Sequence, residues 1–221
     1  MEIHNYVKTS LIDYPGKLAC VVFTQGCMWN CWFCQNAELL PLQKGQVSEQ
    51  EVLNFLKTRV NQLDAVVVCG GEPTMQKDLP KFIKQIKDLG FLVKLDTNGT
   101  NPIVVKELLD KKLLDYVAMD IKTILSKYDD VAKTKVNLNA LKQTIDLLIN
   151  SDIDYEFRTT AIPTILKQDF LEIAKSIRGA KHYYIQHYIS PSKSHPKPTY
   201  IDTDLQEIVA LCNDYVKTSL R

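Results

Sequence analysis

The sequence predicts an α/β fold in which a parallel sheet curls into a barrel or a partial barrel. Short apolar, β-branched runs alternate with helical patterns along the chain, and this unit recurs six times. Parallel strands joined in this way need right-handed crossovers, which can curl the sheet. With 221 residues, 45% of them hydrophobic, the chain can bury one sizeable core, so we expect a single domain over residues 1–221.

The elements follow in order from their composition and their end signals. Residues 18–24 form the first strand, which leads into a cysteine-rich loop. Ser48 and Glu51 form a capping box at the start of the first helix, and Asp78 can cap the second, with Pro80 in its first turn. The other expected elements are strands at 65–69, 92–97, 116–122, 154–162 and 182–189, helices at 102–112, 137–149 and 169–178, and a final helix capped by Asp202 or Thr203.

Three of the six cysteines, Cys27, Cys31 and Cys34, lie in one loop at the spacing C-x3-C-x2-C. Thiols grouped so closely in a chain without an export signal are typical of metal or cluster ligands rather than of disulfides. Iron–sulfur clusters normally have four thiolate ligands, so three would leave one iron open for chemistry. Aromatic residues such as Phe33 would shield such a cluster from water. A structural zinc site with a fourth ligand elsewhere is the alternative. The other three cysteines are expected to be packed free thiols: Cys20, Cys69 and Cys212.

The charge balance and the hydrophobic runs exclude some classes of protein. Lys and Arg number 27 against 26 Asp and Glu, which gives a formal net charge of +1 and no electrostatic footprint of a nucleic-acid binder. The N-terminal residues contain no apolar signal region, and no later run reaches transmembrane length. We therefore expect a soluble, cytoplasmic protein with no nucleic-acid partner and no membrane partner.

One face of several predicted strands is polar, although strands of a parallel sheet covered on both faces are usually apolar throughout. Charged side chains on an inner face need partners. They can pair with one another as internal ion pairs, or they can bind a polar ligand near the strand ends. Gln186 falls on the same face, whereas we expect His187 to be structural. The charged residues of this face are Lys94, Asp96, Asp120, Lys122, Glu156 and Arg158.

A glycine-rich turn follows the predicted strand at 65–69. Gly70 and Gly71 would let the backbone approach a ligand closely, and Glu72 would offer an acceptor for an ammonium group. Alone, the segment Gly-Gly-Glu-Pro would be read as a tight turn. Its position after the cysteine loop favours a ligand-binding turn.

Together these motifs resemble the radical S-adenosylmethionine superfamily, and within it the glycyl-radical enzyme activating proteins, especially those of anaerobic ribonucleoside-triphosphate reductase. The resemblance covers most of residues 6–190. Besides the cysteine loop and the Gly-Gly-Glu-Pro turn, it includes segments 8–17, 95–99 and 119–122. It implies a partial (β/α)6 barrel with parallel strands and the cluster loop after the first strand. It also implies an oxidoreductase that uses a 4Fe–4S cluster and S-adenosyl-L-methionine.

The resemblance also implies roles for individual residues. Cys27, Cys31 and Cys34 would ligate the cluster, and Gly71 and Glu72 would receive the amine of S-adenosylmethionine. Positions 96, 120 and 122 match those that, in pyruvate formate-lyase activating enzyme, line the cofactor and a bound monovalent cation. No catalytic side chain is expected beyond the cluster and the cofactor. With Gln186 added by its strand parity, the expected cofactor-binding residues are Phe33, Gly70, Gly71, Glu72, Asp96, Asp120, Lys122, Arg158 and Gln186.

The implied reaction begins with an electron from a reduced donor such as flavodoxin. The sulfonium C–S bond then breaks homolytically, and a 5′-deoxyadenosyl radical removes hydrogen from the Cα of a glycine in the partner, expected to be anaerobic ribonucleotide reductase. Two alternatives stay open: a small-molecule radical enzyme resembling 7-carboxy-7-deazaguanine synthase, and a non-catalytic zinc-binding protein. Segments 123–136 and 190–199 could dock a partner, although a solvated loop is the simpler interpretation of each.

Overall fold

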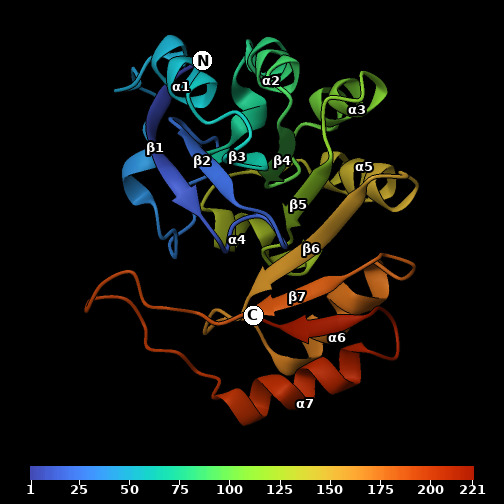
Figure 1. Cartoon of the computed structure of the whole chain (residues 1–221). Coiled ribbons are helices and arrows are strands. Elements are labelled where there is room, and N and C mark those ends of the chain that lie inside the picture. The colour runs from blue at the N-terminus through green and yellow to red at the C-terminus, as the bar shows by residue number, and fades with distance from the viewer. The chain divides into compact units, whose positions relative to one another are not determined.

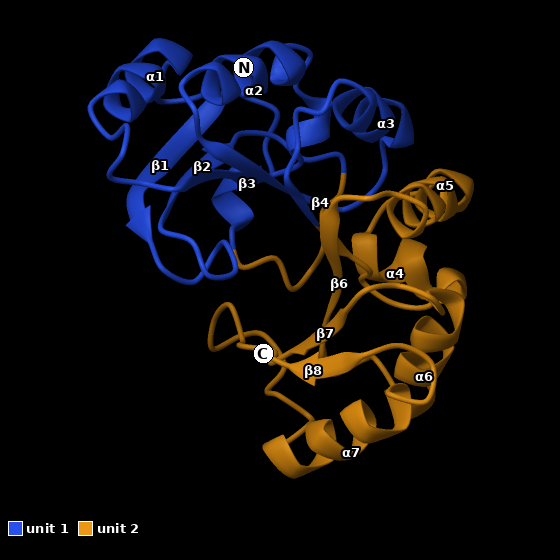
Figure 2. Ribbon diagram, turned by 45° about the vertical axis from the view of Figure 1, so that its right-hand side comes forward, with its two compact units in different colours: residues 1–28, 36–117 blue, residues 29–35, 118–221 orange.

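The computed structural model describes all 221 residues, and their contacts divide the chain into two compact units (Figure 2). Unit 1 comprises residues 1–28 and 36–117, and unit 2 comprises residues 29–35 and 118–221. The unit boundary therefore runs through the cysteine loop, after Met28. The single domain predicted for residues 1–221 stays a prediction.

Unit 1 is built on four adjacent strands that follow one another in chain order (Figure 1). The second, third and fourth strands are parallel, with Ala19 opposite Ala65 and Ala65 opposite Leu92, whereas the first pairs antiparallel with the second. Three helices lie on one side of these strands (Figure 2). The elements are β1 (Ile3–Ser10), β2 (Ala19–Thr24), α1 (Glu49–Lys57), β3 (Ala65–Gly70), α2 (Leu79–Asp88), β4 (Leu92–Thr97) and α3 (Pro102–Asp110).

The helix ends of unit 1 follow largely from local chemistry. The Ser48 side chain accepts a hydrogen bond from the Glu51 N–H at 3.1 Å, which confirms the Ser48 half of the predicted capping box at the start of α1. After α2, Gly90 adopts a φ of +92°, which a glycine takes without strain. The predicted cap at Asp78 is wrong, because its side chain makes no capping hydrogen bond. A preceding turn, closed by the Leu79 N–H on the Gln76 carbonyl, gives Asp78 a ψ of 5° instead of an extended backbone.

Unit 2 contains three adjacent parallel strands and four helices. Residue pairs such as Arg158–Tyr184 and Tyr184–Ser219 set the register of these strands. β5 (Tyr116–Asp120) crosses the unit boundary after Val117. The elements of unit 2 are α4 (Tyr128–Ala132), α5 (Leu138–Ile149), β6 (Asp154–Thr160), α6 (Lys167–Ser176), β7 (Tyr183–Gln186), α7 (Asp202–Cys212) and β8 (Thr218–Leu220).

The structure confirms the predicted fold class, α/β with parallel strands, and adds β1, β8 and the short α4. Along β1 only Ile3 is fully buried, so this strand has no apolar run that a pattern could reveal. The expected caps of α7 are wrong, because Ile201 precedes this helix and its N–H donates to the Asp204 carboxylate at 3.2 Å. None of the helices has the length and apolar character needed to cross a membrane.

Two of the cysteines outside the loop are fully buried, as predicted. Cys20 lies in β2 and Cys212 at the end of α7, and neither side chain is exposed. Burial raises the pKa of Cys20 to about 12 and that of Cys212 to about 11. Cys69 is partly buried and packs against a core that includes Ala65 and Val67.

Candidate functional site

In unit 1, the buried Glu72 side chain joins the Gly-Gly-Glu-Pro turn to the end of β4. Its Oε1 accepts hydrogen bonds from the Thr74 N–H (3.1 Å), the Thr74 hydroxyl (2.6 Å) and the Thr97 hydroxyl (2.7 Å). Its Oε2 accepts the Asn98 N–H at 2.7 Å. Burial raises the pKa of Glu72, and these hydrogen bonds oppose that rise. Glu72 therefore connects the ends of β3 and β4, a role that the sequence did not predict.

Both glycines of this turn are required by close packing of backbone on backbone. A Cβ on Gly70, whose φ is +115°, would clash with the Thr24 backbone, and a Cβ on Gly71 would clash with the Gly26 carbonyl oxygen. The same carbonyl accepts the Glu72 N–H at 2.9 Å. The turn is thus fixed against the start of the cysteine loop.

Cys27 lies at this same end of unit 1. The Asn98 side-chain amide is 4.0 Å from the Cys27 sulfur and 3.5 Å from the Met28 sulfur, and the Thr100 hydroxyl is 3.4 Å from the latter. Because Asn98 also donates its backbone N–H to Glu72, one segment after β4 contacts both the first cysteine and the predicted amine-binding turn.

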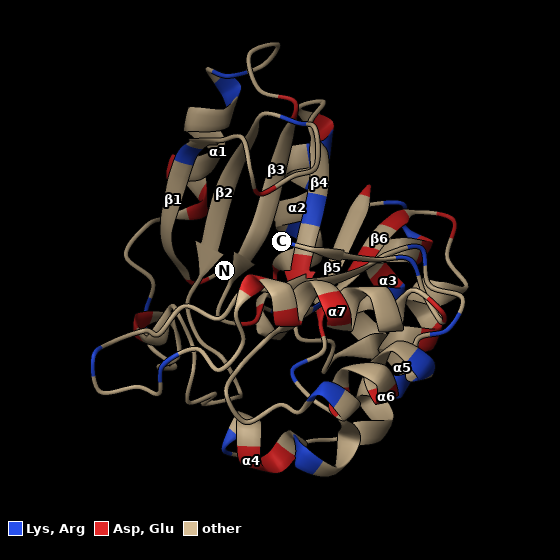
Figure 3. Ribbon diagram, turned by 90° about the horizontal axis from the view of Figure 1, so that it is seen from below, with Lys and Arg blue, Asp and Glu red and all other residues tan.

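The polar face of β4 carries an internal ion pair. Figure 3 shows a basic and an acidic band along this strand. The Lys94 ammonium, with only 2% of its side chain exposed, lies 2.5 Å from the Asp96 carboxylate. Within unit 1, the charged face is thus satisfied by its own residues, and Asp96 keeps 19% of its side chain exposed.

Unit 2 brings together five of the residues expected to bind the cofactor or the cluster. The Asp120 carboxylate accepts hydrogen bonds from Lys122 Nζ and Arg158 Nε, both at 2.8 Å. Burial alone would raise the pKa of Asp120, but Arg158 and Lys122 lower it well below its ordinary value. The Lys122 ammonium also lies 5.8 Å from the centre of the Phe33 ring. Burial raises the pKa of Cys31, and the charge of Lys122 opposes this.

The rest of the polar face in unit 2 lies on β6 and β7. Glu156, fully buried, pairs with Arg221 at 2.7 Å, a partner that the sequence did not suggest. Arg158 lies opposite Tyr184 in the sheet, and Gln186 is two residues farther along β7, so it shares their face as predicted. The His187 imidazole is half-exposed and lies 3.7 Å from the Asp202 carboxylate.

Residues 29–35 form a segment of unit 2 that we call the Cys31 loop. A tight turn is closed by the Cys34 N–H, which donates to the Cys31 carbonyl at 3.0 Å. The Asn30 N–H donates to the carbonyl of Ala132, the last residue of α4, over 2.9 Å. Neither unit by itself contains a group of three His, Cys, Asp or Glu side chains that could hold a metal ion.

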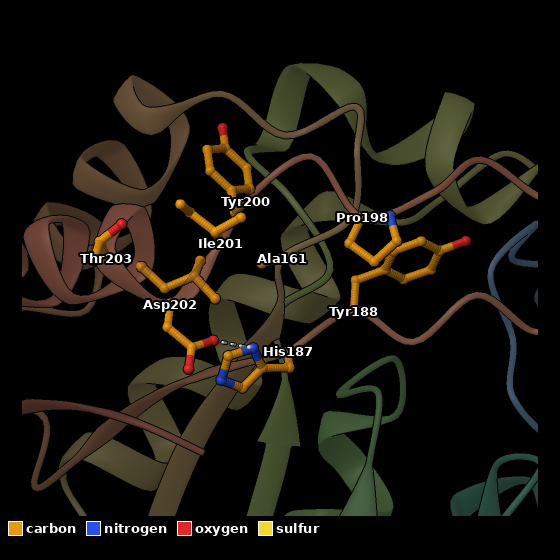
Figure 4. Close-up of a pocket in the computed structure, with 9 residues that line it drawn as sticks. Ala161, His187, Tyr188, Pro198, Tyr200, Ile201, Asp202 and Thr203 are labelled. Carbon is orange, nitrogen blue, oxygen red and sulfur yellow. Dashed lines mark ion pairs between the residues drawn. The ribbon is translucent and has the colours of Figure 1, made fainter.

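A cavity of about 490 Å³, which the sequence did not predict, lies in unit 2 beyond the ends of β6 and β7 (Figure 4). Its walls are the Tyr188 ring and the start of α7, and the His187–Asp202 pair lies at one side. The only sequence signal was the Pro- and Ser-rich stretch at 190–199. The lining residues are Ala161, His187, Tyr188, Pro198, Tyr200, Ile201, Asp202, Thr203 and Leu205.

Comparison with known proteins gives matches over most of the chain. The family model described as the radical SAM superfamily matches residues 21–177. A Methanocaldococcus jannaschii protein, provisionally named as a glycyl-radical enzyme activating enzyme, is 34% identical over 97% of this chain and 92% of its own length. The pyruvate formate-lyase-activating enzyme of Staphylococcus aureus is 31% identical over 56% of this chain and 53% of its own length.

Among solved structures, SuiB of Streptococcus suis bound to S-adenosylmethionine has a TM-score of 0.72 and 15% identity over 89% of this chain. This similarity shows a common fold. The chain spans about half of SuiB, namely 48% of its length.

Proposed function

Because the chain belongs to the radical S-adenosylmethionine superfamily, we propose that it activates a glycyl-radical enzyme. Members of this family use a 4Fe–4S cluster and S-adenosyl-L-methionine, and these are the cofactors of this chain. The observation that carries the proposal is the match to the M. jannaschii protein, because it extends over 97% of the chain and is not confined to the cofactor motifs.

The thiol donors present suit the cluster. We assign Cys27, Cys31 and Cys34 as its ligands, since thiolates hold such clusters and these three lie within eight consecutive residues. Burial raises the pKa of Cys31, and the nearby ammonium of Lys122 opposes this rise. Family membership disfavours the zinc alternative, as does the burial of Cys212, whose thiol lies 3.6 Å from the Phe170 carbonyl in the core.

The unit 1 turn suits the amine of S-adenosylmethionine. The Oε2 of Glu72 accepts only the Asn98 N–H among the hydrogen bonds described above, so it keeps acceptor capacity toward an ammonium group. Glu72 is 1% exposed, whereas Gly70 and Gly71 are half-exposed, so we assign the first contact with the amine to the backbone of the two glycines.

The charged residues of unit 2 suit the rest of the cofactor. Arg158 and Lys122 carry charges opposite to that of its carboxylate, and Asp120 can accept from ribose hydroxyls or hold a monovalent cation, as can Asp96 in β4 of unit 1. Phe33, beside Lys122, offers a ring to the adenine. One-electron reductive cleavage and hydrogen abstraction are the chemistry that the bound cluster and cofactor supply. The side chains bind, orient and exclude water.

We assign the partner as anaerobic ribonucleoside-triphosphate reductase, and the electron would come from a reduced donor such as flavodoxin. The likeness of segments 8–17 and 119–122 to activating proteins of that reductase supports the first assignment. The similarity to the pyruvate formate-lyase-activating enzyme supports a glycyl-radical partner in general.

The test is an anaerobic assay with the reconstituted protein, a reductant and S-adenosylmethionine, with and without the reductase. We expect iron and sulfide in the protein, 5′-deoxyadenosine as a product and a glycyl radical on the reductase by electron paramagnetic resonance. Zinc without sulfide would refute the radical chemistry. Formation of 5′-deoxyadenosine with no radical on any glycyl-radical enzyme would refute the activase and favour a small-molecule substrate.

A further inference from the structure

The loop that follows β7 contacts the Cys31 loop, and one of these contacts joins His195 to Trp32, although the two residues lie 163 positions apart in the chain. We propose that His195 is a positioning residue, which holds the turn between Cys31 and Cys34 in the geometry that the cluster needs. This inference rests on the proposed function, because it takes those two cysteines as cluster ligands.

The hydrogen bonds of His195 define which nitrogen carries the proton. Its Nε2 lies 2.9 Å from the Trp32 carbonyl oxygen, and a carbonyl only accepts, so Nε2 carries a hydrogen and donates. Its Nδ1 lies 2.8 Å from the Ser192 hydroxyl, which can donate to a neutral ring or accept from a protonated one. The donor to Trp32 is therefore present in both protonation states.

The carbonyl that His195 contacts is the one that determines the shape of the turn. In the turn closed by the Cys34 N–H and the Cys31 carbonyl, Trp32 and Phe33 are the two central residues. The common turn types differ by rotation of the peptide between these two residues. By holding the Trp32 carbonyl, His195 fixes that peptide, and with it the directions of the flanking cysteines.

Other contacts from the same loop support this arrangement. The Gln35 amide donates to the Ile189 carbonyl, so the far end of the Cys31 loop is held as well. The Trp32 ring lies 6.1 Å from the Tyr188 ring at an angle of 62°. Within its own loop, the His195 N–H donates to the Ser192 carbonyl at 3.1 Å, which orients the imidazole.

Three variants test whether His195 acts through its hydrogen bond to Trp32 or only through the size of its ring. His195→Phe keeps a ring but removes the donor, His195→Gln restores a donor on a side chain of similar reach, and Lys197→Ala is a matched control at an exposed position of the same loop. In the metal-free protein, we expect hydrogen exchange of peptides covering 31–35 to be about tenfold faster in His195→Phe, the loss expected for one hydrogen bond. We expect wild-type rates in the other two variants.

The reconstituted enzyme supplies a second measurement. We expect His195→Phe to raise the KM for S-adenosylmethionine about tenfold and to change the electron paramagnetic resonance spectrum of the reduced cluster with the cofactor, and His195→Gln to restore both. Wild-type exchange and spectrum in His195→Phe would overturn the inference, and so would an exchange increase spread evenly over the chain.

The iron and sulfide content of Cys31→Ala distinguishes a failure of the proposed function from a failure of this inference. If Cys31→Ala kept its iron and sulfide, the ligand assignment would be wrong, whatever the result for His195. If Cys31→Ala lost them while His195→Phe matched the wild type in every measurement, only the positioning role would be refuted.

Discussion

Replacement of Glu72 by glutamine keeps the shape of a side chain that connects two strand ends but changes one acceptor into a donor. The two carboxylate oxygens accept from two backbone N–H groups, of Thr74 at Oε1 and of Asn98 at Oε2. The Thr74 and Thr97 hydroxyls can rotate to suit either group of the amide. The backbone N–H groups cannot rotate, so in either orientation one of them faces the amide NH₂.

The expected loss of amide protection follows from the one backbone N–H that is left without an acceptor. Leaving one buried backbone N–H without an acceptor costs about 1–3 kcal/mol. With about 1.4 kcal/mol for each factor of ten, protection of the affected amide should fall about 5- to 150-fold. Hydrogen exchange of the metal-free Glu72→Gln protein, followed by nuclear magnetic resonance at Thr74 and Asn98, measures this loss.

Glu38→Gln is the matched control, because Glu38 is exposed in the same unit. We expect it to leave both amides at their wild-type exchange rates. If Glu72→Gln also left both rates unchanged, the carboxylate would not be holding the two strand ends together, and the proposed link between β3 and β4 would be refuted.

Gly71→Ala should lower the unfolding temperature of the metal-free protein sharply, since its Cβ would overlap a carbonyl oxygen. Gly90→Ala should lower the stability by only about 1–2 kcal/mol, from its positive φ, because its Cβ meets no atom within 4 Å. Equal decreases in unfolding temperature for the two variants would contradict the packing argument. Asp120→Asn should be less stable than the wild type at neutral pH. Because its cationic partners lower the pKa of Asp120, the difference should shrink as the pH falls below the ordinary carboxyl range, and a constant difference in urea titrations down to pH 3 would count against it. In reconstitution, Cys31→Ala should fail to retain iron and Cys212→Ala should retain it; equal iron contents would mean that the ligands are misassigned.

Periodic structure made much of the fold predictable. β4 spans Leu92–Thr97, the same range as its prediction, because its apolar residues are bounded by clear turn signals. The polar parity of the strands also placed Asp120 and Arg158 on one face, and they pair at 2.8 Å although they are 38 residues apart. A regular repeat of side-chain directions carries such information over long separations.

Contacts made by irregular segments could not be predicted in this way. Two partners of Glu72 are 25 and 26 residues away, at the last position of β4 and just after it, and Glu72 itself lies in an irregular turn, so no pattern indicated that its side chain links the two strand ends. The contact of His195 with Trp32 joins two loops, and nothing in either loop indicates the other. β1 was missed for a related reason, since its single fully buried residue leaves no pattern.

The burial of Cys20 and Cys212 has a consequence for the handling of the protein in air. With pKa values of about 12 and about 11, only about one molecule in ten thousand and one in a thousand, respectively, carries the reactive anion at pH 8. Alkylating reagents and peroxide attack that anion, so they should spare both positions and react first with the partly buried thiols, which are the three cysteines of the loop and Cys69. In a Cys69→Ser variant, the number of thiols that still react with such a reagent would then report on oxidative damage to the motif.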